Sequence, residues 1–238
     1  MKVCWISAGV SSFVAGYLAK DVDEYIYIDI ENQHPDITRF IEDCEKVLNR
    51  PIRILKSDYR SVQNVIKQFQ FINGIHGAKC TEILKKRVRK EWEYAHRDCD
   101  ITYVWGFDSS EKKRAERLVE SMPEFEHEFP LIDKMLSKQD VHAILDNLGI
   151  KRPKMYDLGY SNNNCIGCVK GGMGYWNKIR VDFPEVFERM AKLEREVGHS
   201  CLNGIYLDEL EPNRGRMEDE IMPDCSIMCY LVQEEMED

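Results

Sequence analysis

The sequence lacks an apolar run of the roughly 18–20 residues that a membrane-spanning helix needs. It also lacks an excess of positive charge, because 33 Lys and Arg face 42 Asp and Glu and give a net charge of -9 at pH 7. That balance argues against nucleic-acid binding through the whole surface and leaves only local basic patches for it. Internal repeats, low-complexity tracts and heptads are absent as well, and 43% hydrophobic with 32% charged residues is typical of a soluble globular protein.

We expect no leader segment, because Met1 leads directly into the first predicted strand. We therefore expect a cytoplasmic protein with no membrane partner. The chain has nine cysteines, an odd number. In a cytoplasmic chain clustered cysteines are more often metal ligands or redox thiols than disulfides. Cys4 and Cys44 have apolar or helical neighbours and are expected to be small core residues.

The chain opens with a strand, a turn of small residues and a helix. Val3–Ile6 form an apolar run, Ser7–Ser12 interrupt it, and Phe13–Ala19 continue as an apolar helix. Because first-turn N–H groups lack internal partners and the helix dipole favours negative charge, this turn can bind a phosphate. It is not a Walker A loop, and the alternative is an ordinary serine-capped turn. The residues expected at the phosphate are Ser7, Ala8, Gly9, Val10, Ser11 and Ser12.

The next segments alternate between strands and helices. Residues 24–30 and 51–55 are predicted as strands and 37–48 as a helix. This order predicts an α/β fold with a doubly wound parallel sheet and flanking helices. Asp29 stands at the carboxyl end of the second strand, where open parallel sheets bind ligands, and can meet a ribose or a metal ion. The alternative for Asp29 is a solvated strand end.

Further elements complete the predicted domain. Helices are expected at 61–71, 82–90, 111–117, 138–148 and 184–197, and strands at 101–108 and 130–132. We assign residues 1–150 to a nucleotide-binding α/β domain. Residues 151–238 are expected to form a helical or irregular C-terminal extension of the same domain that carries a cysteine cluster.

One predicted helix is strongly basic in a chain that is acidic overall. It follows Cys80 and Thr81 and carries Lys85, Lys86, Arg87, Arg89 and Lys90. A thiolate is favoured at a helix N-terminus, so Cys80 is a candidate reactive or metal-binding cysteine. The basic residues are either an anion-binding wall or a solvated helix face.

A second cysteine motif lies in a stretch rich in asparagine and glycine. Cys165 and Cys168 form a Cys-x-x-Cys pair, which zinc sites, iron–sulfur sites and dithiol redox centres all use. One such pair is half a metal site, so further ligands must come from elsewhere. The candidates are Cys80 and the pair Cys225 and Cys229 near the end of the chain.

Three motifs together resemble the phosphoadenosine-phosphosulfate (PAPS) reductase family of the N-type ATP pyrophosphatase, or PP-loop, superfamily. They are Ser7–Ser12, the Cys80-Thr81 element with Leu84-Lys85-Lys86, and Asn164-Cys165-x-x-Cys168. The resemblance extends from Val3 to about Glu196 and implies an adenine nucleotide alpha-hydrolase-like fold with the nucleotide at the first loop. In the family loop, Ser-Gly-Gly-x-Asp-Ser, glycine and aspartate stand where this chain has Ala8 and Ser11.

The resemblance also implies roles for individual residues. A Gly-Phe-x-x-x-Glu-x-x-Arg segment lies near the substrate in the family, and here it corresponds to Gly106, Glu111 and Arg114. Gly106, Arg114, Lys85 and Asp29 are thereby added to the nucleotide-binding set, and Cys80 and Asp29 are the candidate catalytic residues. A 4Fe–4S cluster on Cys80, Cys165, Cys168 and Cys225 is implied, together with ATP and Mg²⁺.

Three functions are compatible with these features. The first is an ATP-dependent sulfurtransferase that adenylates an acceptor, either a nucleic acid or a small molecule, before sulfur transfer. The second is a thiol-dependent reductase of PAPS or adenylyl sulfate, although the family's Glu-Cys-Gly-Leu-His segment is replaced here by Asp224-Cys225-Ser226-Ile227. The third is a nucleotide-binding partner protein without activity that holds a structural zinc. A homo-oligomer is compatible with each of them.

Overall fold

A five-stranded parallel sheet forms the centre of the computed structural model, which describes residues 1–74 and 77–217. Its order is β3-β2-β1-β6-β7, and every neighbouring pair is parallel. The strands are β1 (Lys2–Ile6), β2 (Glu24–Asp29), β3 (Ile52–Lys56), β6 (Thr102–Val104) and β7 (Glu126–Glu128). The chain therefore moves outward from β1 in one direction to β3 and returns to the other side of β1 through β6. This is the predicted doubly wound α/β sheet.

Helices cover both faces of the sheet, and β1 shows how the sequence directs them. Cys4 and Ile6 point into one core and Val3 and Trp5 into the other, as the alternation of a strand requires. The first core is closed by α1 (Val10–Leu18), α2 (Ile37–Leu48) and α8 (Lys138–Asn147). The second is closed by α3 (Val62–Phe69), α5 (Arg87–Ala95) and α6 (Lys112–Ser121).

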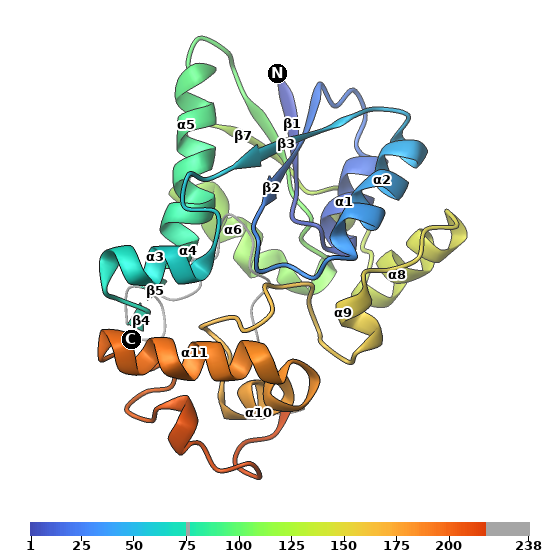
Figure 1. The fold of residues 1–238 in the computed structure, drawn as a ribbon. Helices are drawn as coiled ribbons and strands as arrows, with labels where there is room; N and C mark the ends of the chain where they lie inside the picture. Colours follow the sequence, from blue (N-terminus) through green and yellow to red (C-terminus); the bar gives the residue numbers. More distant parts are fainter. Residues whose placement is uncertain (75–76, 218–238) are drawn as a thin grey trace.

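The C-terminal segment adds a layer at one end of the sheet. Figure 1 shows α10 (Met173–Asp182) and α11 (Pro184–Val197) below the sheet, with the shorter α9 (Lys154–Asp157) preceding them. Trp176 of α10 and Met190 of α11 are fully buried in the same core cluster as Trp5 of β1. This layer is the predicted C-terminal extension. In the part of the chain that the structure describes, no helix combines the length and apolarity needed to cross a membrane.

The predicted strand at 130–132 differs from the structure, and the observed elements β7 and α10 were not predicted. The expected strand at 130–132 is wrong, because these residues belong to the short helix α7 (Pro130–Asp133), which begins with proline at a first-turn position where its missing N–H costs nothing. The last strand is β7, whose three residues are all polar and give no apolar alternation to recognise. Helix α10 was not predicted either, because its first turn lies in the glycine-rich stretch after the Cys-x-x-Cys pair.

The predicted basic helix is built from three pieces. It starts as α4 (Lys79–Thr81), continues as a π-helical turn η1 (Glu82–Lys86), and runs on as α5. A small hairpin of β4 (Asn73–Gly74) and β5 (Gly77–Ala78) precedes it. A π-turn inserts one residue into the helical repeat and often occurs at functional sites.

Candidate functional site

The loop after β1 ends at the open N-terminus of α1. Gly9 is the N-cap in an extended conformation, and no side chain caps it. In the described chain, no acceptor lies within hydrogen-bonding distance of the N–H groups of Val10, Ser11 and Ser12. Three amides without a partner in the described chain and the positive end of the helix dipole therefore lie at this end of α1, as a phosphate site requires.

Two of the three serines shape the loop instead of facing a ligand. The Ser12 hydroxyl accepts from Ser7 N at 2.9 Å and from Ser7 Oγ at 3.1 Å, and it donates to the Gly9 carbonyl at 3.0 Å. The Ser12 side chain is only 7% exposed. Ser11 is half-buried and makes no side-chain hydrogen bond within the described residues. Ser11 is therefore the hydroxyl best placed to donate to a bound phosphate.

Ala8 holds the loop in an unusual backbone conformation. Its φ is 60°, in the left-handed region that glycine adopts without cost and alanine does not. Ala8 stands where the family pattern has glycine, so the backbone keeps the glycine-like conformation although the residue has changed. Strained residues of this kind are concentrated at ligand sites.

Gly106 packs directly against the same loop. It follows β6, the neighbour of β1 across the point where the strand order reverses, and this is where doubly wound folds bind ligands. A Cβ at Gly106 would lie 2.6 Å from both Cα and N of Ser12. Only glycine allows this approach, and the structure thus places predicted residue Gly106 against the loop.

The segment that carries the Cys-x-x-Cys pair crosses the same edge of the sheet. Asn163 Nδ2 donates to the Ala8 carbonyl at 2.7 Å, and Ile166 N donates to the Asn32 carbonyl, after β2, at 2.8 Å. Asn163 is 5% exposed, and its Oδ1 has no donor in the described part of the molecule. A ligand hydroxyl or an ordered water beside the loop would satisfy this buried acceptor.

Three predicted site residues meet around Tyr27 of β2. Burial raises the pKa of the Tyr27 hydroxyl, the nearby charges of Asp29 and Cys165 raise it further, and Lys85 lowers it. The same hydroxyl hydrogen-bonds to Gln33. Residues of the nucleotide set and of the cysteine set therefore lie within electrostatic range of one hydroxyl group.

Asp29 and Lys85 reach this region in different ways. The Asp29 carboxylate, at the end of β2, is 3.1 Å from Lys56 Nζ and 4.0 Å from Arg60. Lys85 lies in the π-turn and is only 8% exposed, whereas its neighbour Lys86 is more exposed. Lys85 and Arg89 are thus the buried cations of this helix, whereas Lys86, Arg87 and Lys90 are more exposed.

The Cys-x-x-Cys turn is fixed by one tyrosine and one glycine. The Tyr175 hydroxyl accepts from Cys168 N at 2.9 Å and donates to the Cys165 carbonyl at 3.1 Å. Gly167 has a φ of 73°, and a Cβ there would lie 2.7 Å from Val186. Both cysteines are 6% exposed. These contacts hold the backbone of the turn in place, although it lies in a loop between helices.

Cys201 is a further cysteine at this place, and the sequence analysis missed it. Burial, the Glu194 carboxylate and the proximity of Cys168 and Cys80 raise the pKa of its thiol well above the usual value. Glu194 is fully buried and accepts from Cys201 N and, at 2.6 Å, from Leu207 N. The only signal in the sequence was its position just after the amphipathic helix 184–197.

The thiols of the described residues do not form a metal centre. The cysteines of residues 1–74 and 77–217 are all free thiols, and within these ranges no three His, Cys, Asp or Glu side chains converge tightly enough to hold a metal ion. The predicted ligand Cys225 lies outside the described residues. The predicted ligands Cys80, Cys165 and Cys168 share one core cluster, and Cys201 belongs to it.

Arg114 lies on α6 beside the loop that follows β6. It forms an ion pair with Glu111 at 2.6 Å and lies 4.7 Å from the centre of the Phe107 ring. Burial raises the pKa of Glu111, and the Arg114 charge opposes this rise. The structure therefore shows Arg114 held in a fixed position by these two residues, with only 13% of its side chain exposed.

The sheet order, the open helix N-terminus after β1 and the glycine contact from β6 are features of α/β proteins that bind phosphates where the strand order reverses. The comparison with family models agrees. Residues 2–171 match the phosphoadenosine phosphosulfate reductase domain, and the chain belongs to this family.

A curated relative is also found. The chain is 24% identical over 196 aligned residues to the uncharacterized protein MJ0066 of Methanocaldococcus jannaschii. The match covers 75% of this chain and 37% of the relative, so the chain spans little more than a third of the length of that protein.

Proposed function

We propose that this protein is an ATP-dependent sulfurtransferase that activates an acceptor by adenylation. The observation that carries the proposal is the hydrogen bond from Asn163 to the Ala8 carbonyl, because it joins the thiol-bearing segment to the phosphate loop. A nucleotide bound at this loop has its phosphates close to the cysteines. Membership of the PAPS reductase domain family supports chemistry that combines an adenine nucleotide with sulfur.

The residues of the loop would bind the phosphates of ATP. The amides of Val10, Ser11 and Ser12 and the Ser11 hydroxyl donate to phosphate oxygens, and the Lys85 ammonium neutralises part of the phosphate charge. Asp29 accepts a hydrogen bond from the ribose or holds a water of Mg²⁺. The buried Asn163 oxygen accepts from a nucleotide hydroxyl or from a bound water.

The reaction is two successive displacements. An acceptor oxygen attacks the α-phosphorus, so the O–P bond forms, the bond to the bridging oxygen of the β-phosphate breaks, and pyrophosphate leaves. Sulfur at the sulfide oxidation level then attacks the acceptor carbon, and the C–O bond breaks with release of AMP. Amides and a buried ammonium that are already in place stabilise the charge that develops on the phosphates.

The thiols of Cys80, Cys165, Cys168 and Cys201 would hold the iron–sulfur cluster of the proposed enzyme, with Cys225 the alternative to Cys201. Their chemistry fits the group, because clustered thiolates are the ligands of such clusters. Burial and the Glu194 carboxylate raise the pKa of Cys201, so its thiol would have to lose its proton to bind the cluster. When bound, the cluster supplies a centre that binds sulfur or carries electrons.

The first test is an absorption spectrum with iron, sulfide and zinc analysis of protein purified without oxygen. The proposal expects iron and acid-labile sulfide, with loss of both in Cys165→Ala and Cys168→Ala. Pyrophosphate release from ATP in the presence of candidate acceptors then tests the adenylation step. Colourless protein with one zinc would favour the nucleotide-binding partner without activity.

A thiol-dependent reductase of PAPS or adenylyl sulfate is the second candidate, and the family match favours it. Cys80, the most exposed of the four thiols, would be the attacking group. Protein that carries no metal and forms sulfite from adenylyl sulfate with a thiol reductant, without releasing pyrophosphate from ATP, would establish this alternative.

A further inference from the structure

The exposed side of the basic helix forms a groove that the nucleotide site does not use. The groove has a volume of about 1160 Å³ and lies along α4, η1 and α5, between α3 and the end of the Cys-x-x-Cys segment. Its charged and aromatic lining consists of Lys79, Lys86, Arg87, Lys90, Lys170, Phe69, Phe71, Tyr94, Glu82 and Glu91. Five cations thus face two carboxylates in a chain whose net charge is -9.

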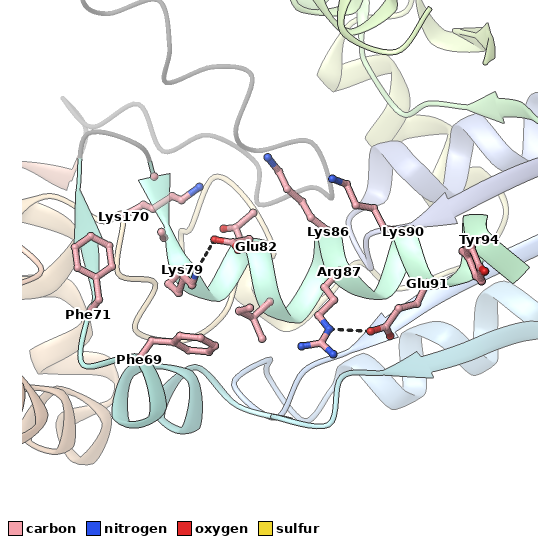
Figure 2. Close-up of a pocket in the computed structure, with 14 residues that line it drawn as sticks. Phe69, Phe71, Lys79, Glu82, Lys86, Arg87, Lys90, Glu91, Tyr94 and Lys170 are labelled. Atoms are coloured by element: carbon pink, nitrogen blue, oxygen red, sulfur yellow. Dashed lines mark hydrogen bonds and ion pairs between the residues drawn. The ribbon is translucent and has the colours of Figure 1, made fainter. Parts of the chain in front are cut away.

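The cations form a strip with aromatic rings at its ends. Figure 2 shows Phe69 and Phe71 near one end and Tyr94 at the other, with Lys86 and Lys90 projecting between them. Tyr94 is 71% exposed, and the Arg97 guanidinium lies 4.8 Å from the centre of its ring. The strip from residue 79 to Tyr94 extends about 22 Å at the helical rise of about 1.5 Å per residue.

Two ion pairs of the groove are exposed to solvent. Arg87 pairs with Glu91 and Lys79 with Glu82, each at 2.8 Å, and both carboxylates are more than half exposed. Such exposed pairs contribute little and exchange readily for a stronger anion. Lys90 has no ion pair anywhere in the described residues, and Lys79 Nζ lies 5.0 Å from the centre of the Phe69 ring.

From this combination we infer that the groove binds single-stranded nucleic acid. A row of cations tracks a phosphate backbone, and exposed rings stack on unpaired bases, which a duplex would keep inside. At about 3.4 Å per stacked nucleotide, the strip accommodates about six nucleotides. An acidic peptide would pair with the cations but would not stack on the exposed rings at the two ends.

The groove also leads to the thiols. Ala78, Lys79 and Thr81, which flank Cys80, line it, and so does Lys170, which follows Cys168 closely in the sequence. A strand in the groove therefore passes beside the cysteine site. Identifying this strand as the sulfur acceptor rests on the proposed function, whereas the binding itself does not.

Fluorescence anisotropy with labelled oligonucleotides of about ten residues, as RNA, as DNA and as the matching duplex, tests the inference on the full chain. We expect single strands to bind at least tenfold more tightly than the duplex, and polyglutamate to compete weakly. The RNA and DNA arms show which sugar is preferred. No single-strand binding at low salt, equal affinity for duplex, or equal competition by polyglutamate would overturn the inference.

Variants separate the two kinds of contact. Tyr94→Ala should weaken single-strand binding about tenfold, because a stacked base is lost. Lys86→Gln combined with Lys90→Gln should reduce the slope of log affinity against log salt by about 1.4, about 0.7 per phosphate contact. The matched controls Tyr17→Ala on α1 and Lys112→Gln with Lys113→Gln on α6 should change neither quantity. If the groove variants leave both the affinity and its salt dependence unchanged, as these controls should, the groove is not the binding site.

ATP titration of the same variants distinguishes the two proposals. Groove variants should bind ATP as the unmodified protein does, because none of the substituted residues belongs to the phosphate loop. Strand binding without any ATP binding would leave the groove in place and defeat the proposed function. ATP binding without strand binding would overturn the groove and leave the proposed function in place.

Discussion

The phosphate loop and the cysteine segment meet at the same edge of the sheet but are held in different ways. The loop is closed by its own residues, through the hydrogen bonds among Ser7, Gly9 and Ser12. The cysteine segment is held by groups far away in the sequence, including Ala8 through Asn163 and the hydroxyl of Tyr175. The loop should therefore keep its form when the cysteine segment is disturbed, whereas the cysteine segment depends on the loop.

The largest effect is expected where the loop depends on a distant residue. In Gly106→Ala, the new Cβ would lie 2.6 Å from Ser12 Cα and N, and both atoms are backbone that cannot move aside cheaply. We expect a loss of about 3 kcal/mol in the free energy of unfolding and an at least hundredfold weaker ATP affinity. Urea denaturation and calorimetric titration with ATP measure the two.

Gly198→Ala is the control for Gly106→Ala. Gly198 ends α11 with a φ of 70°, and open space surrounds the position of its Cβ. This substitution should cost only about 1 kcal/mol, through backbone strain, and should leave ATP affinity unchanged. If Gly106→Ala binds ATP normally, the close approach of β6 does not shape the phosphate site.

Glu194→Gln tests the support of the cysteine site. The carboxylate accepts from the N–H groups of Cys201 and Leu207, so an amide would turn an NH₂ group toward one of these donors. We expect a loss of about 2 kcal/mol in stability at pH 7, the cost of a buried donor left without an acceptor. Metal content should fall as well, while ATP affinity should stay within twofold.

The difference in stability between the unmodified protein and Glu194→Gln should depend on pH in a defined direction. Burial raises the pKa of Glu194 above its usual value of 4.5, so the folded protein holds this proton more tightly than the unfolded chain does. The stability that protonation contributes is present below pH 4.5 and is lost as pH rises through the raised pKa. Relative to Glu194→Gln, the unmodified protein should therefore lose stability as pH rises. A constant difference from pH 4 to pH 7 would contradict this.

Tyr175→Phe removes the hydroxyl that bridges the Cys-x-x-Cys turn. The N–H of Cys168 and the carbonyl of Cys165 would lose their buried partner, at a cost of about 1–2 kcal/mol. We expect lower metal content at unchanged ATP affinity. Tyr25→Phe is the matched control, because Tyr25 donates to the Gly16 carbonyl on α1, away from the thiols. Equal metal loss in both variants would exclude a specific role for Tyr175.

The sequence was sufficient for features that depend on local patterns. The alternation of apolar strands and helices predicted the parallel sheet, which is confirmed. The small residues of Ser7–Ser12 predicted a turn before a helix, and the structure begins that helix at Val10 instead of Phe13. The family motifs also led to Gly106, although the steric reason for a glycine there is visible only when β6 lies beside α1.

Other features depend on contacts that no local pattern reveals. Cys201 reaches the other thiols only because the buried Glu194 folds the chain back after α11. Likewise, the three serines of the loop look equivalent in the sequence, yet Ser7 and Ser12 bond to each other. The π-turn that contains both Lys85 and Lys86 has no apolar periodicity of its own. The polar strand β7 pairs along the edge of β6, a partner that its own sequence does not reveal.

A smaller effect is expected at the rim of the nucleotide site. In Asp29→Asn, the ion pairs with Lys56 and Arg60 are lost, but all three side chains are about a third exposed or more, so stability should change by less than about 0.5 kcal/mol. ATP affinity should nevertheless fall about tenfold if the carboxylate binds ribose or a magnesium-bound water. Unchanged affinity would assign Asp29 to a solvated strand end.

The smallest effect is expected for Ala8→Gly, which restores the glycine of the family loop. Relief of the strained φ of 60° should stabilise the protein by about 1 kcal/mol. The loss of a buried methyl group and the greater freedom of the unfolded chain should cost about as much. We therefore expect a net change within about 0.5 kcal/mol and an ATP affinity within threefold, because the backbone at this position already has the conformation that glycine would adopt. A tenfold change in ATP affinity without a change in stability would mean that the Ala8 methyl group itself meets the nucleotide, and the loop would then not be preformed by its backbone alone.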